Sequence, residues 1–201
     1  MAQADGAGVP GTSCHLESRR EARILRLQSE DGTNRLNREF MLSFTNIVRE
    51  LVTEGSPLII SGNQKFFSAG ADLGEISTMN GPAAYEFSQM GQGLMSAIEN
   101  FPAPVYAAIS GYCMGGGLDL ALACHRRIAA PNAVFGHRGA ALGLITGWGG
   151  TQRLPRLIGK GRALELLVAA EKLHAEQALR IGLIDAITAD PVEEAVRCVQ
   201  G

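Results

Sequence analysis

The chain has 201 residues, of which 46% are hydrophobic and 19% are charged, and its formal net charge is −2. This balance is typical of a globular domain with a sizeable core. It provides no basic field for nucleic acid or acidic membranes, and no apolar run approaches the roughly 20 residues that span a bilayer.

The N-terminal part is expected to contain a tail, a strand and a long helix. Residues 1–20 are rich in Gly, Ala and Ser, which predicts a disordered tail. The apolar residues within Glu21–Gln28 predict a strand. From Asn37 to Glu54 hydrophobic residues recur at helical spacing, and Gly55 is expected to end that helix.

The middle of the chain alternates short apolar strands with helices. Pro57–Ser61 and Pro104–Ser110 are typical of buried parallel strands. Pro82–Asn100 predicts a helix with a proline in its first turn. Two further helices are predicted over Arg162–Ala170 and Ala175–Ile181, and a late strand is predicted over Gly182–Thr188. This order predicts an α/β fold with parallel strands.

The last residues begin another amphipathic helix after the core domain, which is expected over residues 21–190. Within residues 191–201, one face collects Val192, Ala195, Val196 and Val199. A helix of about two turns is marginal unless its apolar face docks on something. We therefore expect either that this helix is truncated or that its apolar face docks on another surface.

The four cysteines indicate a reducing compartment. Cys14, Cys113, Cys124 and Cys198 form no CxxC pair and have no histidine spacing suited to zinc. The sequence predicts no metal site. The start of the chain lacks the hydrophobic segment of a signal peptide, so reduced thiols in the cytoplasm are expected.

Three glycines stand where a strand gives way to a helix, in YCMGGGLDLALAC from Tyr112 to Cys124. Glycines there allow a ligand close to the backbone, and the free N–H groups of a helix N-terminus favour an anion or a developing oxyanion. The alternative is tight packing through small residues. Asp119 lies in the apolar helix that follows, where a carboxylate is costly to bury without a partner or a task.

A second glycine loop, FFSAGAD from Phe66 to Asp72, follows the strand Pro57–Ser61. Ligands of parallel sheets bind at the carboxyl ends of the strands, so both loops are expected at the same edge. Two backbone N–H donors that converge there can hold a thioester oxygen as it becomes negative.

Four segments resemble the enoyl-CoA hydratase/isomerase family in the family's order and spacing. They are FFSAGADLGEI, AAISGYCMGGGLDLALACHRRIAAPNAVFG, GLITGWGGTQRLPRLIGKGRALELL and AEQALRIGLIDAI. TNRLNREFM resembles the family's early helix start. The resemblance covers residues 22–188. It implies the crotonase fold, a β-β-α superhelix whose C-terminal helical region is largely missing here, and acyl-CoA thioester chemistry.

The resemblance also assigns the oxyanion hole. Its two backbone N–H donors fall on Ala71 and on Gly116, the middle glycine of the three. Substrate contacts are implied for the residues near these donors, namely Leu36, Ala69, Gly70, Asp72 and Gly115. Asp72 is expected to cap a helix or hold the loop rather than to catalyse.

Family hydratases use two glutamates, and only one position keeps a carboxylate here. Asp119 stands at the first position, with a side chain one methylene shorter. The second position is Gly139, and Gly147 stands where some relatives carry an aspartate. Between Glu99 and Glu165 the chain has no carboxylate other than Asp119, so a two-carboxylate mechanism is not supported.

Three side chains near these positions have more than one interpretation. His137 either replaces the missing acid or base, or is a structural or surface residue. Arg138 either binds a substrate carboxylate or is solvated. Trp148 either packs in the core or shapes a pocket for a bulky acyl group. His125, near the end of a helix, is expected to be structural, with its protonated form favoured there.

Together these features predict an acyl-CoA-processing enzyme, nominally an enoyl-CoA hydratase. Isomerisation, hydrolysis and aromatic acyl-CoA chemistry stay open as variant reactions. The alternative is an acyl-CoA-binding subunit without activity, whereas a serine peptidase based on Ser110 lacks a suitably placed His–Asp pair. The resemblance implies a homotrimer or a dimer of trimers. No cofactor is expected, since coenzyme A is part of the substrate.

Overall fold

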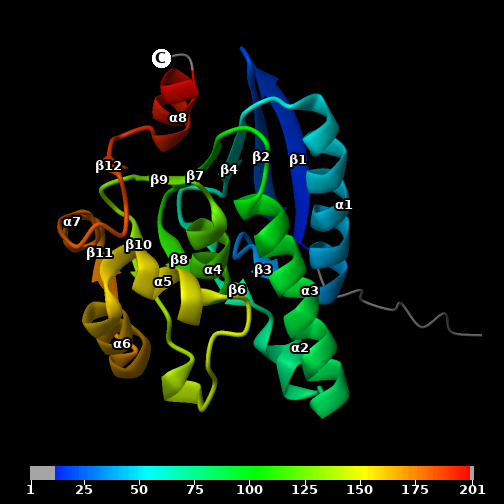
Figure 1. The fold of residues 1–201 in the computed structure, drawn as a ribbon, viewed down its shortest axis with the longest axis vertical. Helices are drawn as coiled ribbons and strands as arrows, with labels where there is room; N and C mark the ends of the chain where they lie inside the picture. Colours follow the sequence, from blue (N-terminus) through cyan, green and yellow to red (C-terminus); the bar gives the residue numbers. More distant parts are fainter. Residues whose placement is uncertain (1–11, 200–201) are drawn as a thin grey trace, which may run out of the picture.

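The structure is a computed structural model that describes residues 12–199. A six-stranded sheet crosses the upper part of the molecule, in the order β1-β2-β4-β7-β9-β12 (Figure 1). Its strands are β1 (Thr12–Arg19), β2 (Ala22–Ser29), β4 (Leu58–Ser61), β7 (Val105–Ile109), β9 (Arg126–Ala129) and β12 (Ala186–Ile187). Neighbours from β2 to β12 are parallel, as predicted, and β1 pairs with β2 in antiparallel fashion.

A second sheet has four strands in the order β11-β10-β8-β5. They are β5 (Phe66–Ser68), β8 (Tyr112–Met114), β10 (Val134–Gly136) and β11 (Leu173–His174). Since β5, β8 and β10 are parallel, their carboxyl ends meet at one edge. Beside them, β3 (Arg35–Leu36) pairs with β6 (Gly70–Ala71). The glycine loops leave from this edge, so it is where the predicted site assembles.

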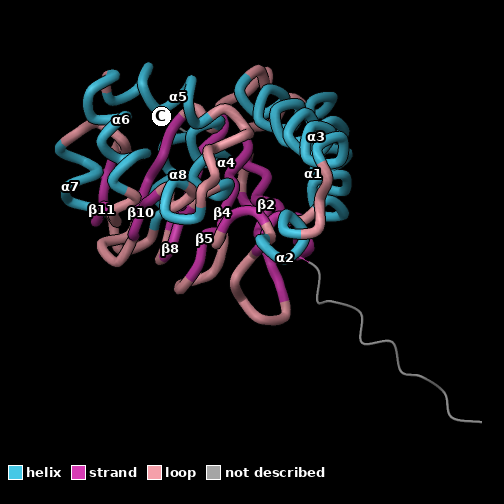
Figure 2. Tube along the Cα trace, turned by 90° about the horizontal axis from the view of Figure 1, so that it is seen from below, coloured by secondary structure: helices cyan, strands magenta, loops and turns pink. Residues whose placement is uncertain are grey.

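The helices flank the sheets in two groups. They are α1 (Arg38–Glu54), α2 (Leu73–Ser77), α3 (Gly81–Glu99), α4 (Gly116–Ala123), α5 (Gly150–Ile158), α6 (Lys160–Ala169), α7 (Ala175–Arg180) and α8 (Pro191–Val199), with a 3₁₀ turn, η1 (Ala140–Leu142). Figures 1 and 2 show α1 and α3 packed together on one flank and α5, α6 and α7 gathered on the other. The α/β fold with parallel strands is confirmed.

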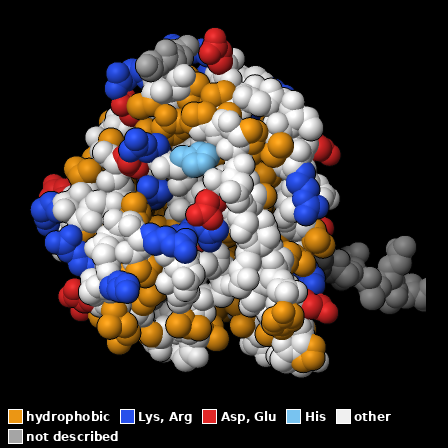
Figure 3. All heavy atoms as spheres, in the orientation of Figure 1, with side chains coloured by type: hydrophobic (Ala, Val, Ile, Leu, Met, Phe, Trp, Pro, Cys, Tyr) orange, Lys and Arg blue, Asp and Glu red, His pale blue; other side chains and the backbone are white. Residues whose placement is uncertain are grey.

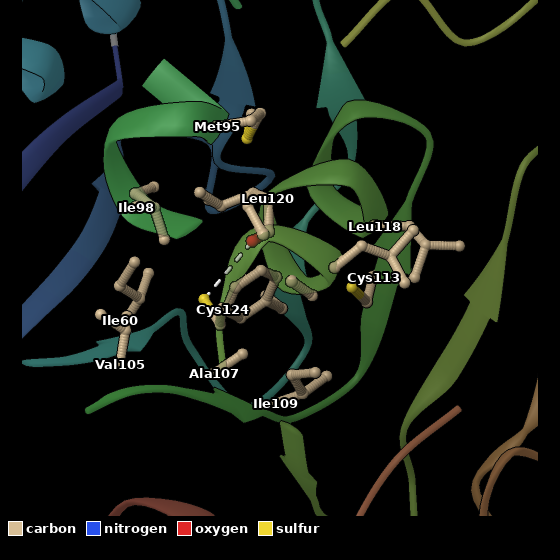
Figure 4. Packing of buried hydrophobic residues seen from close by; sticks show 14 of the residues in the cluster. Ile60, Met95, Ile98, Val105, Ala107, Ile109, Cys113, Leu118, Leu120 and Cys124 are labelled. Carbon is tan, nitrogen blue, oxygen red and sulfur yellow. Dashed lines mark hydrogen bonds between the residues drawn. The ribbon is translucent and has the colours of Figure 1, made fainter. Parts of the chain in front are cut away.

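Helix α4 lies in the centre of the hydrophobic core. All of its residues are buried. Figure 4 shows Leu120 of α4 among Met95 and Ile98 of α3 on one side and Ala107 and Ile109 of β7 on the other. Burying one such large apolar side chain contributes about 1.5–3 kcal/mol. The packing therefore holds the helix, and with it the position of its N-terminus, in place.

Two side chains hold the C-terminal end of α4 against the main sheet. The buried guanidinium of Arg127 donates to Cys124 O at 2.7 Å and to Leu183 O at 2.9 Å. His125 Nδ1 accepts from the Val105 amide at 2.8 Å, and its Nε2 lies 3.1 Å from Glu99 O. His125 is structural, as expected, but a ring nitrogen that accepts carries no hydrogen. The prediction of a protonated imidazole is therefore wrong.

Both ends of the described chain pack on the main sheet. The prediction of a tail over residues 1–20 is wrong for residues 12–19, which form β1, and residues 1–11 lie outside the described residues. Ala195 and Val196 of α8 are buried against the sheet, among Ile24 of β2 and Ile59 of β4. The surface on which this short amphipathic helix docks is thus the chain's own sheet.

Candidate active site

Each of the three consecutive glycines at the start of α4 has its own steric reason. Gly115 has a φ of +52°, a region that side chains rarely adopt. A Cβ atom on Gly116 would lie 2.2 Å from Cζ3 of Trp148, and one on Gly117 would lie 2.7 Å from Cβ of Ser68. The helix N-terminus therefore packs directly on β5 and on the indole. Tight packing and an accessible backbone coexist in this segment.

The two glycine loops meet, as predicted. Gly70 has a φ of +95°, and a Cβ atom on it would lie 2.6 Å from Met114 O and 2.9 Å from Gly116 N. A Cβ atom on Gly116 would lie 3.2 Å from Ala71 N. Because Gly116 is the first residue of α4, its N–H has no acceptor within the helix. The backbones that carry the two predicted oxyanion donors are thus in contact.

A cavity of about 940 Å³ opens at this junction, between α2, α3, the start of α4 and the loop after β10. Its wall includes most of the predicted site residues, namely Ala69, Ala71, Asp72, Gly115, Gly116, Asp119, His137 and Trp148. Leu36 and Gly70 are not in the wall. Leu36 is fully buried in the core, where it pairs with Ala71 across β3 and β6. The Leu36 side chain therefore does not make the substrate contact that was expected of it.

Asp119 is buried in the cavity wall and has two partners. The Thr146 hydroxyl donates to Oδ2 at 2.5 Å, and His137 Nε2 lies 3.3 Å from Oδ1. A Cβ atom on Gly150 would lie 2.3 Å from Oδ1, so this glycine makes room for the carboxylate. Sequence reasoning missed Thr146, since a lone threonine in a glycine-rich loop gives no signal of its own.

His137 is buried, with 5% of its surface exposed. It enters the cavity wall from the loop after β10 and is not a surface residue. The position expected to carry the second glutamate is different. Gly139 has no side chain, and a Cβ atom there would lie 2.8 Å from Leu144 O. In this loop, the residue that contacts the Asp119 carboxylate is therefore His137 and not Gly139.

Trp148 both packs and lines the cavity. Its indole meets the Phe87 ring edge to face, with centroids 5.3 Å apart and planes at 71°. A Cβ atom on Gly91 of α3 would lie 2.1 Å from Cδ1 of the indole. The two interpretations of Trp148 therefore do not exclude each other, since the packed ring is itself part of the cavity wall.

Asp72 caps α2, as expected. Its Oδ1 accepts from the Gly74 amide at 2.8 Å and from the Glu75 amide at 3.1 Å. The cavity wall also includes three basic residues, Arg35, Arg138 and Lys172. Arg138 is exposed, which fits its solvated interpretation. Figure 3 shows hydrophobic side chains gathered along the lower edge of this face, over α6 and the loop after β10 and over α2.

Neither the buried cysteines nor Ser110 supplies a nucleophile to this site. Burial raises the pKa of the Cys113 thiol well above its ordinary value and that of Cys124 to about 12, so both stay neutral. Ser110 is not in the cavity wall. Within residues 12–199 no histidine hydrogen-bonds to Ser110. Separately, none of the helices in this range is long and apolar enough to cross a bilayer. The site therefore offers donors and a His–Asp pair rather than a nucleophile.

Comparison with known proteins identifies the family. A model of the enoyl-CoA hydratase/isomerase family matches residues 20–200. The chain belongs to this family. Its predicted crotonase fold is confirmed by solved relatives, among them an enoyl-CoA hydratase from Bacillus anthracis. That structure superposes with a TM-score of 0.88 at 35% identity, over 93% of this chain and 75% of that one.

Curated members of the enoyl-CoA hydratase/isomerase family are similar to the chain in sequence. It is 39% identical over 175 residues to a crotonyl-CoA hydratase of Syntrophomonas wolfei, which covers 86% of this chain and 67% of that protein. It is 46% identical over 137 residues to a probable enoyl-CoA hydratase of Bacillus subtilis, which covers 68% of this chain and 53% of that protein. The matches thus span about half to two thirds of these relatives' length. The prediction of an enoyl-CoA hydratase/isomerase-type enzyme is confirmed at the level of the family.

Proposed function

We propose that the chain adds water across the double bond of an enoyl-CoA thioester. The observation that carries this proposal is the meeting of two features in one cavity. The backbones of Ala71 and Gly116 come together at its wall, and the Asp119–His137 pair lies in the same wall. The names of the crotonyl-CoA and enoyl-CoA hydratases among its relatives support the same reaction.

The two N–H groups serve the developing charge. As water attacks the β-carbon, electrons move to the thioester oxygen, and an enolate forms. Donors held in place by a packed helix stabilise that oxygen without reorganising, and one such donor is worth about 10²–10³ in rate. Gly116 has this character because α4 is buried along its whole length. Ala71 is fixed by the pairing of β6 with β3.

The cavity wall also supplies what the rest of the reaction needs. The pair of Asp119 and His137 moves a proton or orients the attacking water. Water and the thioester are the two reactants consumed. The guanidinium groups of Arg35 and Arg138 and the ammonium group of Lys172 suit the phosphates of a CoA moiety. Trp148 and Phe87 form an apolar wall for the acyl group.

The purified protein and its Asp119→Ala variant test this proposal with crotonyl-CoA. Hydration is followed as the loss of ultraviolet absorbance of the conjugated enoyl thioester. We expect turnover by the wild type and a kcat about 10²–10⁴-fold lower in the variant, the range for a lost proton-transfer group. Equal turnover by both proteins would remove Asp119 from the reaction.

A second candidate, an acyl-CoA-binding subunit without activity, is favoured by one observation. Gly139 stands at the position of the second carboxylate, and the backbone around it leaves no room for a side chain. This candidate predicts tight binding of CoA thioesters, measured by calorimetry, with no turnover of any member of a substrate panel. Turnover of crotonyl-CoA would exclude it.

We also propose the homotrimer that the family resemblance implies, or a dimer of such trimers. The measurement is size-exclusion chromatography with light scattering at micromolar concentration. A monomer under these conditions would contradict the trimer without bearing on the chemistry of the cavity.

A further inference from the structure

We infer that His137 is the catalytic residue that carries the proton in this reaction, and that Asp119 is the positioning residue that holds its imidazole. The inference rests on the proposed hydration and names the group that moves the proton. Three features carry it: the contact between the two side chains, the surroundings of the second ring nitrogen, and the other groups of the cavity wall.

The contact with Asp119 fixes the imidazole tautomer. His137 Nε2 lies 3.3 Å from Asp119 Oδ1. A carboxylate oxygen accepts, so in the neutral imidazole Nε2 carries the hydrogen and Nδ1 has the lone pair. The carboxylate is itself fixed, because Thr146 donates to its other oxygen at 2.5 Å. This arrangement gives Asp119 the role that a buried aspartate has toward a catalytic histidine: it orients the ring and stabilises the imidazolium.

The second nitrogen, Nδ1, is available to a reactant. His137 is part of the wall of the large cavity and of a neighbouring cavity of about 440 Å³. Within residues 12–199 no hydrogen bond to Nδ1 is found. Among these residues, Ser61 Oγ is the one side-chain polar atom that is fully buried without a partner, so the unpartnered Nδ1 is not fully buried. Nδ1 is therefore not sealed within the protein. A ring nitrogen with a lone pair at a cavity wall can take a proton from water held there.

The other groups of the described cavity wall are less suited to this role. The Asp72 carboxylate is committed to two amides of α2. Both Asp119 oxygens already accept a hydrogen bond, from Thr146 and from His137. The guanidinium groups of Arg35 and Arg138 have donors only and no lone pair for a proton. The ammonium group of Lys172 lies over the Tyr112 ring, 5.2 Å from its centroid, and also has donors only. His137 is the group of this wall with both an oriented ring and a free lone pair.

The proposed step balances. One O–H bond of water breaks and its proton goes to Nδ1, while the water oxygen forms a bond to the β-carbon. The π electrons move to the thioester oxygen at the Ala71 and Gly116 N–H groups. The enolate then takes the proton from Nδ1 at the α-carbon, and a C–H bond forms. His137 returns to its starting state, and Asp119 faces the transient imidazolium without exchanging a proton.

The test compares His137→Gln, His137→Ala and Asp119→Ala in crotonyl-CoA hydration. Gln keeps a donor toward Asp119 but cannot take a proton. We expect its kcat to fall about 10²–10⁴-fold with little change in KM. Added imidazole should restore turnover in His137→Ala in a saturable manner and should not restore it in Asp119→Ala. His15, an exposed histidine on β1, gives the matched control His15→Gln, whose kcat should equal that of the wild type.

The outcomes separate this inference from the proposed function. A kcat in His137→Gln within about tenfold of the wild-type value overturns the role of His137 and leaves hydration standing. A loss in His137→Ala that imidazole does not restore overturns it as well, since a structural role explains that result. A wild-type protein that binds crotonyl-CoA without turnover overturns both the inference and the proposed hydration. Circular dichroism and thermal unfolding check that each variant is folded.

Discussion

The close approach of the two glycine loops can be tested at Gly70, which carries neither of the proposed donors. Gly70→Ala adds one methyl group where φ is +95° and where the new atom would lie 2.6 Å from Met114 O and 2.9 Å from Gly116 N. Both contacts are backbone atoms that cannot rotate away. The substitution therefore has to move the loop that carries Ala71 away from the start of α4.

Gly55→Ala isolates the part of this effect that comes from the dihedral angle alone. Gly55 has a φ of +66°, and a Cβ atom on it would have no neighbour within 4 Å. Ala in the left-handed region costs about 1–2 kcal/mol. At Gly70 the collision adds about 1–3 kcal/mol, the usual cost of overpacking. We expect the unfolding free energy to fall by about 1–2 kcal/mol in Gly55→Ala and by about 2–5 kcal/mol in Gly70→Ala.

The kinetic effect distinguishes the two variants further. Separating the loops weakens one oxyanion donor, so kcat for crotonyl-CoA should fall about 10²–10³-fold in Gly70→Ala and stay unchanged in Gly55→Ala. Urea unfolding gives the stabilities, and the ultraviolet assay gives kcat. If folded Gly70→Ala protein kept the wild-type kcat, the two backbones would not form an oxyanion hole, whatever the change in stability.

Two further substitutions and two further measurements test the cavity and the core. Trp148→Ala removes an indole packed on Phe87 and should cost about 3–5 kcal/mol in urea unfolding while raising kcat/KM for longer acyl chains relative to crotonyl-CoA. Asp72→Ala removes a helix cap and should cost about 1 kcal/mol with kcat unchanged. Iodoacetamide at about pH 8 should label the exposed Cys198 in the folded protein and the buried Cys124 only after unfolding, as read by mass spectrometry. Burial raises the pKa of Cys124 to about 12 from 9.0, so its contribution to stability is complete below pH 9 and is lost as the pH rises toward 12. A urea midpoint that did not fall above pH 9 would contradict that shift.

Elements with a strong hydrophobic period could be predicted from the sequence. The long helix α1 follows its predicted range within one residue, with Asn37 as its N-cap and Gly55 as its C-cap. The apolar runs that became β4 and β7 lie at the centre of the sheet, where both faces are buried. In these segments burial, capping and turn chemistry all favour the same structure, so local reasoning is sufficient.

Elements that depend on a partner strand could not be predicted in this way. β1 is mostly exposed and polar, and it exists because it pairs with β2 along its whole length. β3 and β6 have two residues each and form through their pairing with one another. Their hydrogen bonds join segments that are far apart in the chain, and no periodicity within either segment predicts this pairing. β12 is predicted as a strand, but its observed range, Ala186–Ile187, is shorter than the predicted one.

The site divides along the same line. Glycines at strand ends predicted two loops with converging backbone donors, and the family resemblance assigned these donors to Ala71 and Gly116. The Thr146 hydroxyl and the His137 ring reach Asp119 across 27 and 18 residues of chain, and neither contact has a sequence pattern. Only the folded loop shows that three separate segments supply the surroundings of one carboxylate.

The difference between positions 139 and 137 shows why matching a residue to a family position can miss the group that acts. At Gly139 the backbone turns so tightly that a Cβ atom would lie 2.8 Å from Leu144 O, so a carboxylate placed there by mutation would have to displace the loop first. Two residues earlier, directly after the end of β10, the His137 side chain points to Asp119. In the sequence alone, the missing carboxylate suggests that the ability to transfer a proton has been lost. The folded chain, however, places His137 in contact with the remaining carboxylate, Asp119. Proton transfer in this cavity can therefore be tested at that contact.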